Sequence, residues 1–71
     1  MAEIKAEMAG NVWKIVAKVG DSVSEGDTLV ILESMKMEIP IEADRDGTVK
    51  EIRVKEGDAI QDGAVIAVIE E

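Results

Sequence analysis

Hydrophobic residues along this chain either alternate with polar ones or form short β-branched blocks. The clearest segments are "NVWKIVAKV", "TLVILE", "EIPIEA", "TVKEIRV" and "AVIAVIE". A period of two residues is typical of strands and not of helices. Turns that contain glycine separate the segments, and many short strands of this kind indicate a sandwich or a small barrel. The pattern therefore predicts an all-β fold.

An internal repeat organises these expected strands. A shift that places Ile4 on Ile41 aligns residues 4–33 with residues 41–70 without a gap, and ten of the thirty aligned pairs are identical. Several of them are turn glycines, where the backbone needs freedom that side chains restrict. The repeat predicts two halves of equal topology, related by a two-fold axis. The identical pairs are Ile4/Ile41, Ala6/Ala43, Gly10/Gly47, Val12/Val49, Ile15/Ile52, Lys18/Lys55, Gly20/Gly57, Asp21/Asp58, Gly26/Gly63 and Glu33/Glu70.

Residues 34–40 connect the two repeats and are predicted to form a hairpin. Expected strands at roughly Thr28–Glu33 and Met37–Ala43 flank a tip made of "SMK" or "MKM". Under two-fold symmetry the counterpart of this connection is the gap between the last and the first strand, so Lys36 should lie opposite the chain termini. Pro40 has no amide hydrogen and is expected at a sheet edge or at a non-bonded position.

Length and composition predict one small domain over residues 1–71. The chain has no Phe, no Tyr and a single Trp, so we expect a narrow core of Val, Ile, Leu and Ala, with Trp13 packed over one end of it. Cysteine and histidine are both absent, which removes thiol nucleophiles, thiolate and imidazole metal ligands and the commonest general base. No catalytic residue and no metal site is predicted.

The charge balance narrows the expected partners and location. Eight basic and sixteen acidic residues give a formal charge of -8, which disfavours nucleic acid and anionic membranes as partners. No apolar run approaches the roughly 20 residues that cross a bilayer, and the N-terminal residues lack the features of a secretion signal. We expect a cytoplasmic monomer.

Lys36 stands between two methionines in the expected hairpin. A lysine on a turn is ordinarily just a solvated charge. Here Met35 and Met37 would also be exposed at the tip, and an exposed pair of adaptable apolar side chains is typical of a docking surface. The residues by themselves thus predict an accessible lysine amine on a rigid hairpin.

The segment "ESMKMEIP", with "MAGNVWKI" at Met8–Ile15 and "DGTVKEI" at Asp46–Ile52, resembles the biotinyl/lipoyl attachment domain family. The likeness is greatest to its free-standing bacterial members of the biotin carboxyl carrier type, and it spans essentially the whole chain. It implies a flattened barrel of two four-stranded antiparallel sheets with quasi-two-fold symmetry. It also implies covalent biotin on Lys36, flanking methionines at Met35 and Met37, and recognition by biotin protein ligase through Glu33, Ser34 and Glu38.

This resemblance implies a carrier and not an enzyme. In the family, the ligase activates biotin as an acyl-adenylate and the lysine amine attacks it to form an amide. The attached biotin then carries carboxyl groups between two active sites of a biotin-dependent carboxylase, so the domain supplies tethering and the cofactor supplies the chemistry.

Two other functions stay open. Lipoyl carriers share the barrel and attach lipoate to the equivalent lysine, and Glu33, Ser34 and the "EIP" after Met37 look partly lipoyl-like, whereas the two methionines favour biotin. The second alternative is an unmodified barrel that serves as a docking or structural module. Such a module needs no lysine at the hairpin tip.

Overall fold

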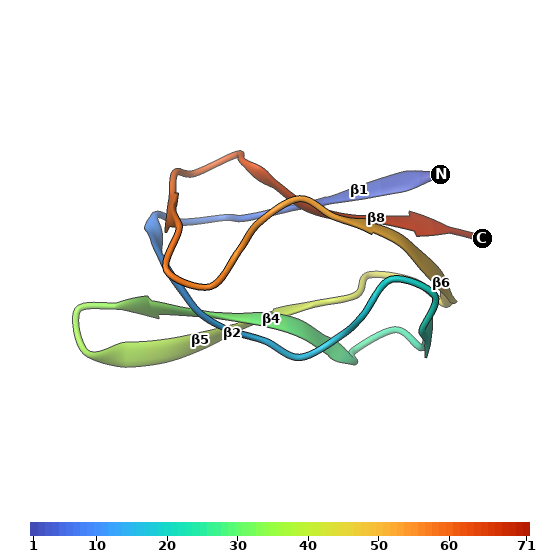
Figure 1. Cartoon of the computed structure of the whole chain (residues 1–71), viewed down its shortest axis with the longest axis horizontal. Coiled ribbons are helices and arrows are strands. Elements are labelled where there is room, and N and C mark those ends of the chain that lie inside the picture. Colours follow the sequence, from blue (N-terminus) through green and yellow to red (C-terminus); the bar gives the residue numbers. More distant parts are fainter.

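The computed structural model describes residues 1–71 and contains eight β-strands and no helix (Figure 1). Four strands form one antiparallel sheet in the order β1-β8-β6-β3, and four form a second in the order β5-β4-β2-β7. The predicted all-β fold with two four-stranded sheets is confirmed. The strands are β1 (Ala2–Lys5), β2 (Gly10–Ile15), β3 (Ser22–Val23), β4 (Thr28–Ser34), β5 (Met37–Glu42), β6 (Gly47–Ile52), β7 (Ala59–Ile60) and β8 (Val65–Glu70).

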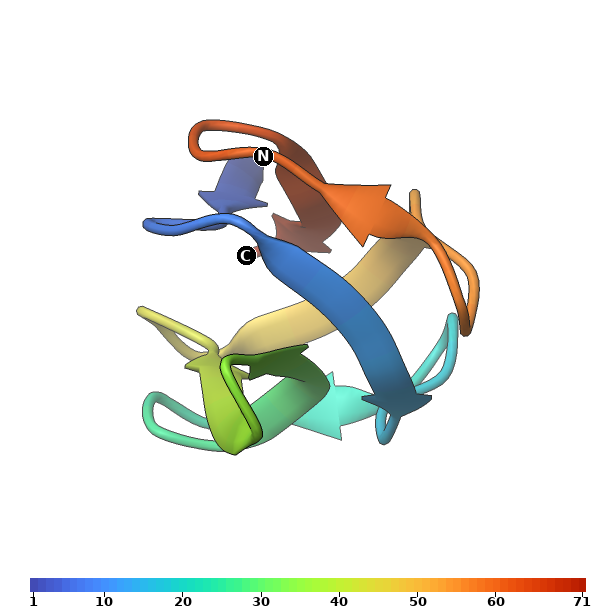
Figure 2. The same cartoon turned by 90° about the vertical axis from the view of Figure 1, so that its left-hand side faces the viewer.

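The two sheets are equivalent under the sequence repeat. The repeat relates β1 to β5, β8 to β4, β6 to β2 and β3 to β7, so the strand order of one sheet reproduces that of the other. Local irregularities match as well, because the register shift at Trp13 in β2 has its counterpart at Lys50 in β6. Figure 2, which looks along the molecule from the hairpin side, shows the two halves wrapped around a common interior. The predicted quasi-two-fold symmetry is confirmed.

The loops before β3 and before β7 join the two halves. Gly20 donates its backbone N–H to the carbonyl of Val49 at 2.8 Å, and Gly57 donates to the carbonyl of Val12 at 2.8 Å. Both glycines have positive φ, 96° and 94°, a conformation that L side chains disfavour. Each half therefore anchors a loop of its own on a strand of the other.

The core is aliphatic throughout. Its 16 buried residues are all Val, Ile, Leu or Ala, as the composition predicts, and no polar or charged residue is buried. Its centre is built from β4 and β8, whose Leu29, Leu32, Ile66 and Ile69 have no exposed surface. Burying each such side chain contributes about 1.5–3 kcal/mol. The strand that leads to Lys36 therefore starts from the best packed part of the molecule.

Trp13 does not pack over an end of this core, and that prediction is wrong. The side chain is 48% exposed and lies outside the core cluster. Val12 faces the interior, and the register shift between Val12 and Lys14 is a β-bulge, in which two residues oppose one on the partner strand. The bulge leaves both Trp13 and Lys14 exposed.

The molecule is elongated, with extents of 33 × 17 × 17 Å. The β4–β5 hairpin forms one end, and the N- and C-termini lie together at the other (Figure 1). This arrangement confirms the prediction that Lys36 lies opposite the termini. Pro40 lies on β5, an edge strand, as predicted. The structure offers no helix with the length and apolar character to cross a bilayer.

Candidate functional site

The tip of the β4–β5 hairpin is a turn of two residues. Ser34 at the end of β4 pairs with Met37 at the start of β5, so only Met35 and Lys36 lie between the strands. Their φ angles are 53° and 66°, and two positive values in a two-residue loop are the signature of a type I′ turn. The twist of this turn matches that of the flanking strands, so the hairpin stays regular up to Lys36. The predicted tip is thus located on its two central residues.

The side chains at the tip face solvent. Met35 is 89% exposed and Met37 is 56% exposed, which confirms the prediction that both methionines face solvent. Lys36 is also exposed. All five ion pairs of the structure involve other residues, and the Lys36 amine makes no hydrogen bond. The amine is therefore free to enter the active site of another protein.

Two carboxylates lie directly behind the tip. Glu33 on β4 and Glu38 on β5 are opposite each other in the ladder, and both are exposed. Like charges in this arrangement destabilise a strand pair, so sheet stability does not account for them. The six consecutive residues that the family resemblance marks all lie on this hairpin, and the structure adds which of them face each other across it: Glu33, Ser34, Met35, Lys36, Met37 and Glu38.

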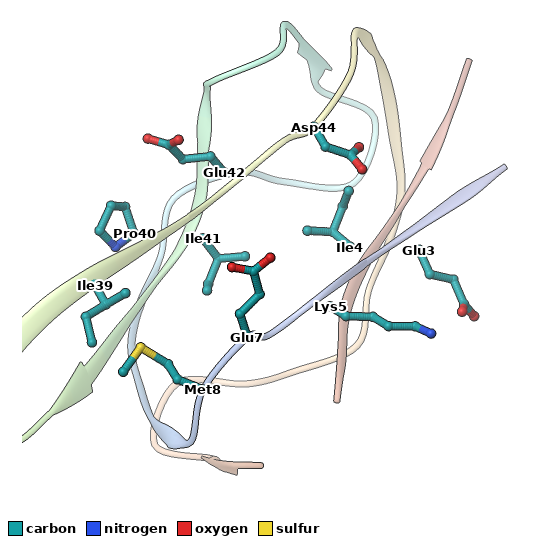
Figure 3. Close-up of a pocket in the computed structure, with 10 residues that line it drawn as sticks. All are labelled: Glu3, Ile4, Lys5, Glu7, Met8, Ile39, Pro40, Ile41, Glu42 and Asp44. Carbon is teal, nitrogen blue, oxygen red and sulfur yellow. The ribbon is translucent and has the colours of Figure 1, made fainter. Parts of the chain in front are cut away.

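A groove of about 480 Å³ lies elsewhere, at the seam between the edge strands β1 and β5 (Figure 3). Asp44, one of the residues that line this groove, accepts a hydrogen bond of 2.9 Å from Arg45. This bond holds the pKa of the Asp44 carboxyl below its usual range. No three acidic side chains come close enough together to hold a metal ion. Lys36 is not part of the groove, so the hairpin tip remains the candidate site. The groove is lined by Glu3, Ile4, Lys5, Glu7, Met8, Ile39, Pro40, Ile41, Glu42 and Asp44.

The sequence reasoning missed an exposed apolar group on the outer face of the β5-β4-β2-β7 sheet, which we call the hairpin sheet. Trp13, Val16 and Pro40 are exposed there, and Ile31 is half-buried between them. A sign of this group is present in the repeat, because the equivalents of Trp13, Val16 and Pro40 in the other half are all charged. Those equivalents are Lys50, Arg53 and Glu3.

A rigid all-β scaffold that presents one unpaired lysine amine on a tight turn is typical of domains that carry a group covalently on a lysine. The comparison with protein families agrees with this class. The chain belongs to the family described as "Biotin-requiring enzyme", whose sequence model matches residues 1–69.

Similar proteins include small bacterial ones and a large carboxylase. The chain is 56% identical over 41 residues to the biotin/lipoyl attachment protein of Bacillus subtilis. This alignment covers 58% of this chain and 56% of that protein. It is 57% identical over 44 residues to the biotinylated protein TB7.3 homolog of Mycolicibacterium smegmatis. That alignment covers 61% of this chain and 62% of the other protein. These alignments span less than two thirds of either relative.

A solved structure matches nearly the whole fold. The urea carboxylase of Kluyveromyces lactis superposes with a TM-score of 0.93 and 40% identity, covering 97% of this chain and 6% of that one. The chain thus corresponds to one small part of a large carboxylase.

Proposed function

We propose that this chain is a biotin carrier domain in which biotin is joined by an amide bond to the Lys36 Nζ. The observation that carries the proposal is the exposed, unpaired amine of Lys36 on a two-residue turn between Met35 and Met37. Membership of the biotin-requiring family supports biotin as the group, and so does the likeness to a protein named as biotinylated.

Attachment follows from the chemistry of an activated acid. A biotin protein ligase supplies biotinyl-adenylate, and the neutral Lys36 amine attacks its carbonyl carbon. The C–N bond forms as the C–O bond to AMP breaks, and the amine proton leaves to a base of the ligase or to water. This chain supplies only the nucleophile and the surface around it, namely Glu33, Ser34, Met35, Met37 and Glu38.

Once attached, biotin works for a partner enzyme. The likeness to one part of a urea carboxylase supports a biotin-dependent carboxylase as that partner. Tethering to a compact domain raises the effective concentration of biotin at each of two active sites. The chain acts as a carrier, a cytoplasmic monomer in our proposal, and catalyses no step by itself.

Mass spectrometry of the intact chain tests this proposal. Coexpression with a biotin protein ligase should add one biotinyl group, and Lys36→Arg should remove it completely, because arginine keeps the charge but has no acylatable amine. Lys50→Arg, on the opposite face, is the matched control and should keep full biotinylation.

The same experiment with a lipoate ligase separates the alternative carrier. Biotin on wild type with none on Lys36→Arg supports the proposal. A lipoyl group on Lys36 without biotin, or biotin that persists in Lys36→Arg, contradicts it.

A further inference from the structure

The β1-β8-β6-β3 sheet contains the strands at both chain termini, and we call it the terminal sheet. Ion pairs between charged side chains cover its outer face. Glu3, Val68 and Glu51 form one row across β1, β8 and β6. Arg53 reaches Glu3 at 3.6 Å and Glu51 at 3.1 Å, so its guanidinium spans the strand between them and lies over Val68. Val68 is only 5% exposed and is the one buried residue outside the core cluster. The charged side chains therefore cover the apolar one.

A second ion pair extends this cover. Lys50, at the bulge of β6, contacts Glu70 of β8 at 3.4 Å. Together the two sets of contacts leave no large apolar side chain exposed on this part of the terminal sheet.

The hairpin sheet has the same backbone but different side chains at the same positions. Its equivalent row is Pro40, Ile31 and Lys14 on β5, β4 and β2. Val16 stands in place of Arg53 and Trp13 in place of Lys50, so no ion pair forms and no guanidinium covers Ile31. We call Trp13, Val16, Ile31 and Pro40 the Trp13 face.

The symmetry of the fold acts as an internal control. Since the two sheets share strand order, register and bulges, the fold itself does not require apolar groups at these positions. The terminal sheet shows that the same backbone folds with charged side chains at these positions. Trp13 and Val16, about half exposed, are therefore unexplained by folding and indicate a surface that a partner covers.

The Trp13 face lies within reach of any protein that closes on Lys36. Ile31 is three residues before Ser34 on β4, which is about 10 Å at about 3.3 Å per residue. A standard interface covers about 800 Å² on each partner, a patch roughly 30 Å across. A protein whose interface extends from the tip along the outer face of this sheet therefore reaches Trp13.

The charge pattern defines the partner's surface. Glu33 and Glu38 lie on the same outer face, between the Trp13 face and the tip. No cation pairs with either of them. The complementary surface is thus apolar opposite Trp13 and basic opposite the two glutamates.

We propose that the Trp13 face is the docking surface for biotin protein ligase, with Trp13 as its main contact. The inference rests on the proposed biotinylation of Lys36. The ligase must choose one of six lysines, and the other five are Lys5, Lys14, Lys18, Lys50 and Lys55, so it has to bind the folded surface beside Lys36. A carboxylase, by contrast, meets biotin at the end of a long arm. Buried tryptophans dominate the affinity of many interfaces.

Steady-state biotinylation kinetics test the docking surface. Trp13→Ala should lower kcat/KM at least tenfold, mainly by raising KM, because the reacting amine is untouched. A graft of the terminal face, with Trp13→Lys, Lys14→Glu, Val16→Arg and Pro40→Glu together, should have at least as large an effect. Lys50→Ala on the terminal face is the matched control and should stay within twofold of wild type.

Two further measurements separate docking from folding and from the proposed function. Thermal melts should show that Trp13→Ala is folded at the assay temperature, and a small biotin N-hydroxysuccinimidyl ester should acylate Lys36 equally in wild type and variant. A wild-type chain that is never biotinylated would refute the proposed function. Normal KM in both Trp13→Ala and the graft, with wild type fully biotinylated, would refute the docking surface alone.

Discussion

At the scale of single residues, Met35 and Lys36 adopt a backbone conformation that other residues adopt more readily. The left-handed region costs an ordinary L residue about 1–2 kcal/mol, and type I′ turns favour Asn-Gly for that reason. Behind the turn, Glu33 faces Glu38 with like charge. Local strain of this kind gathers at functional sites. The tip sequence therefore fits recognition better than it fits stability.

Replacing the turn with its preferred residues should stabilise the domain. Met35→Asn combined with Lys36→Gly relieves the strain at both positions, and we expect a gain of about 1–3 kcal/mol. For a chain of this size, each kcal/mol raises the melting temperature by about 4–8 °C. Circular dichroism melts measure the change. Met35→Ala keeps a Cβ at a positive φ and should give no comparable rise, and an unchanged double variant would show that the turn is unstrained.

At the scale of elements, close contact between β2 and β4 sets the position of the hairpin. A Cβ built on Gly10, at the start of β2, would lie 2.9 Å from the backbone oxygen of Glu33. The repeat reproduces this contact at Gly47, whose Cβ would lie 2.7 Å from the oxygen of Glu70. Only the first contact adjoins β4, the strand that leads into the turn with Lys36.

Alanine at these two glycines should separate stability from function. Gly10→Ala and Gly47→Ala should each cost about 1–3 kcal/mol, because the added methyl group forces neighbouring backbones apart. At a temperature where both variants are folded, only Gly10→Ala should slow biotinylation of Lys36. Melting curves and biotinylation rates check the two parts. Equal rates in the two variants would mean that this contact does not position the hairpin.

At the scale of the whole molecule, the two halves of the chain are interlocked. Each sheet takes two strands from the first repeat and two from the second. The loop hydrogen bonds of Gly20 and Gly57 also cross between the halves. Neither half contains a complete sheet or a core of its own.

Fragments cut at the hairpin should therefore be unfolded by themselves. Peptides of residues 1–35 and 36–71 should each lack the far-ultraviolet circular dichroism of strands, and the intact chain should unfold in one cooperative transition. Mixing the two peptides is the control, since it restores both sets of strands and should recover part of the strand signal. A stable fold in either peptide alone would contradict the interlocked architecture.

The sequence by itself predicted five of the eight strands, their duplication and the hairpin at Lys36, but its alternation pattern did not predict the short strands β1, β3 and β7. These features depend on local chemistry, because alternation sets the two faces of a strand and glycine sets the turns. At the hairpin, β4 ends at Ser34 where Glu33 was expected, and β5 ends at Glu42 where Ala43 was expected, a difference of one residue each. The aliphatic composition of the core was equally predictable, since the chain has no Phe, no Tyr and a single Trp.

Only the tertiary structure decided which apolar side chains are covered. The alternation around Trp13 does not reveal the bulge that turns it outward, because a bulge is a mismatch with another strand. In the same way, Arg53 covers Val68 only because β1, β8 and β6, distant in sequence, align Glu3 and Glu51 on either side of it. Whether one side chain covers another in this way depends on the register between neighbouring strands. The pattern of hydrophobic and polar residues along the sequence does not contain that register.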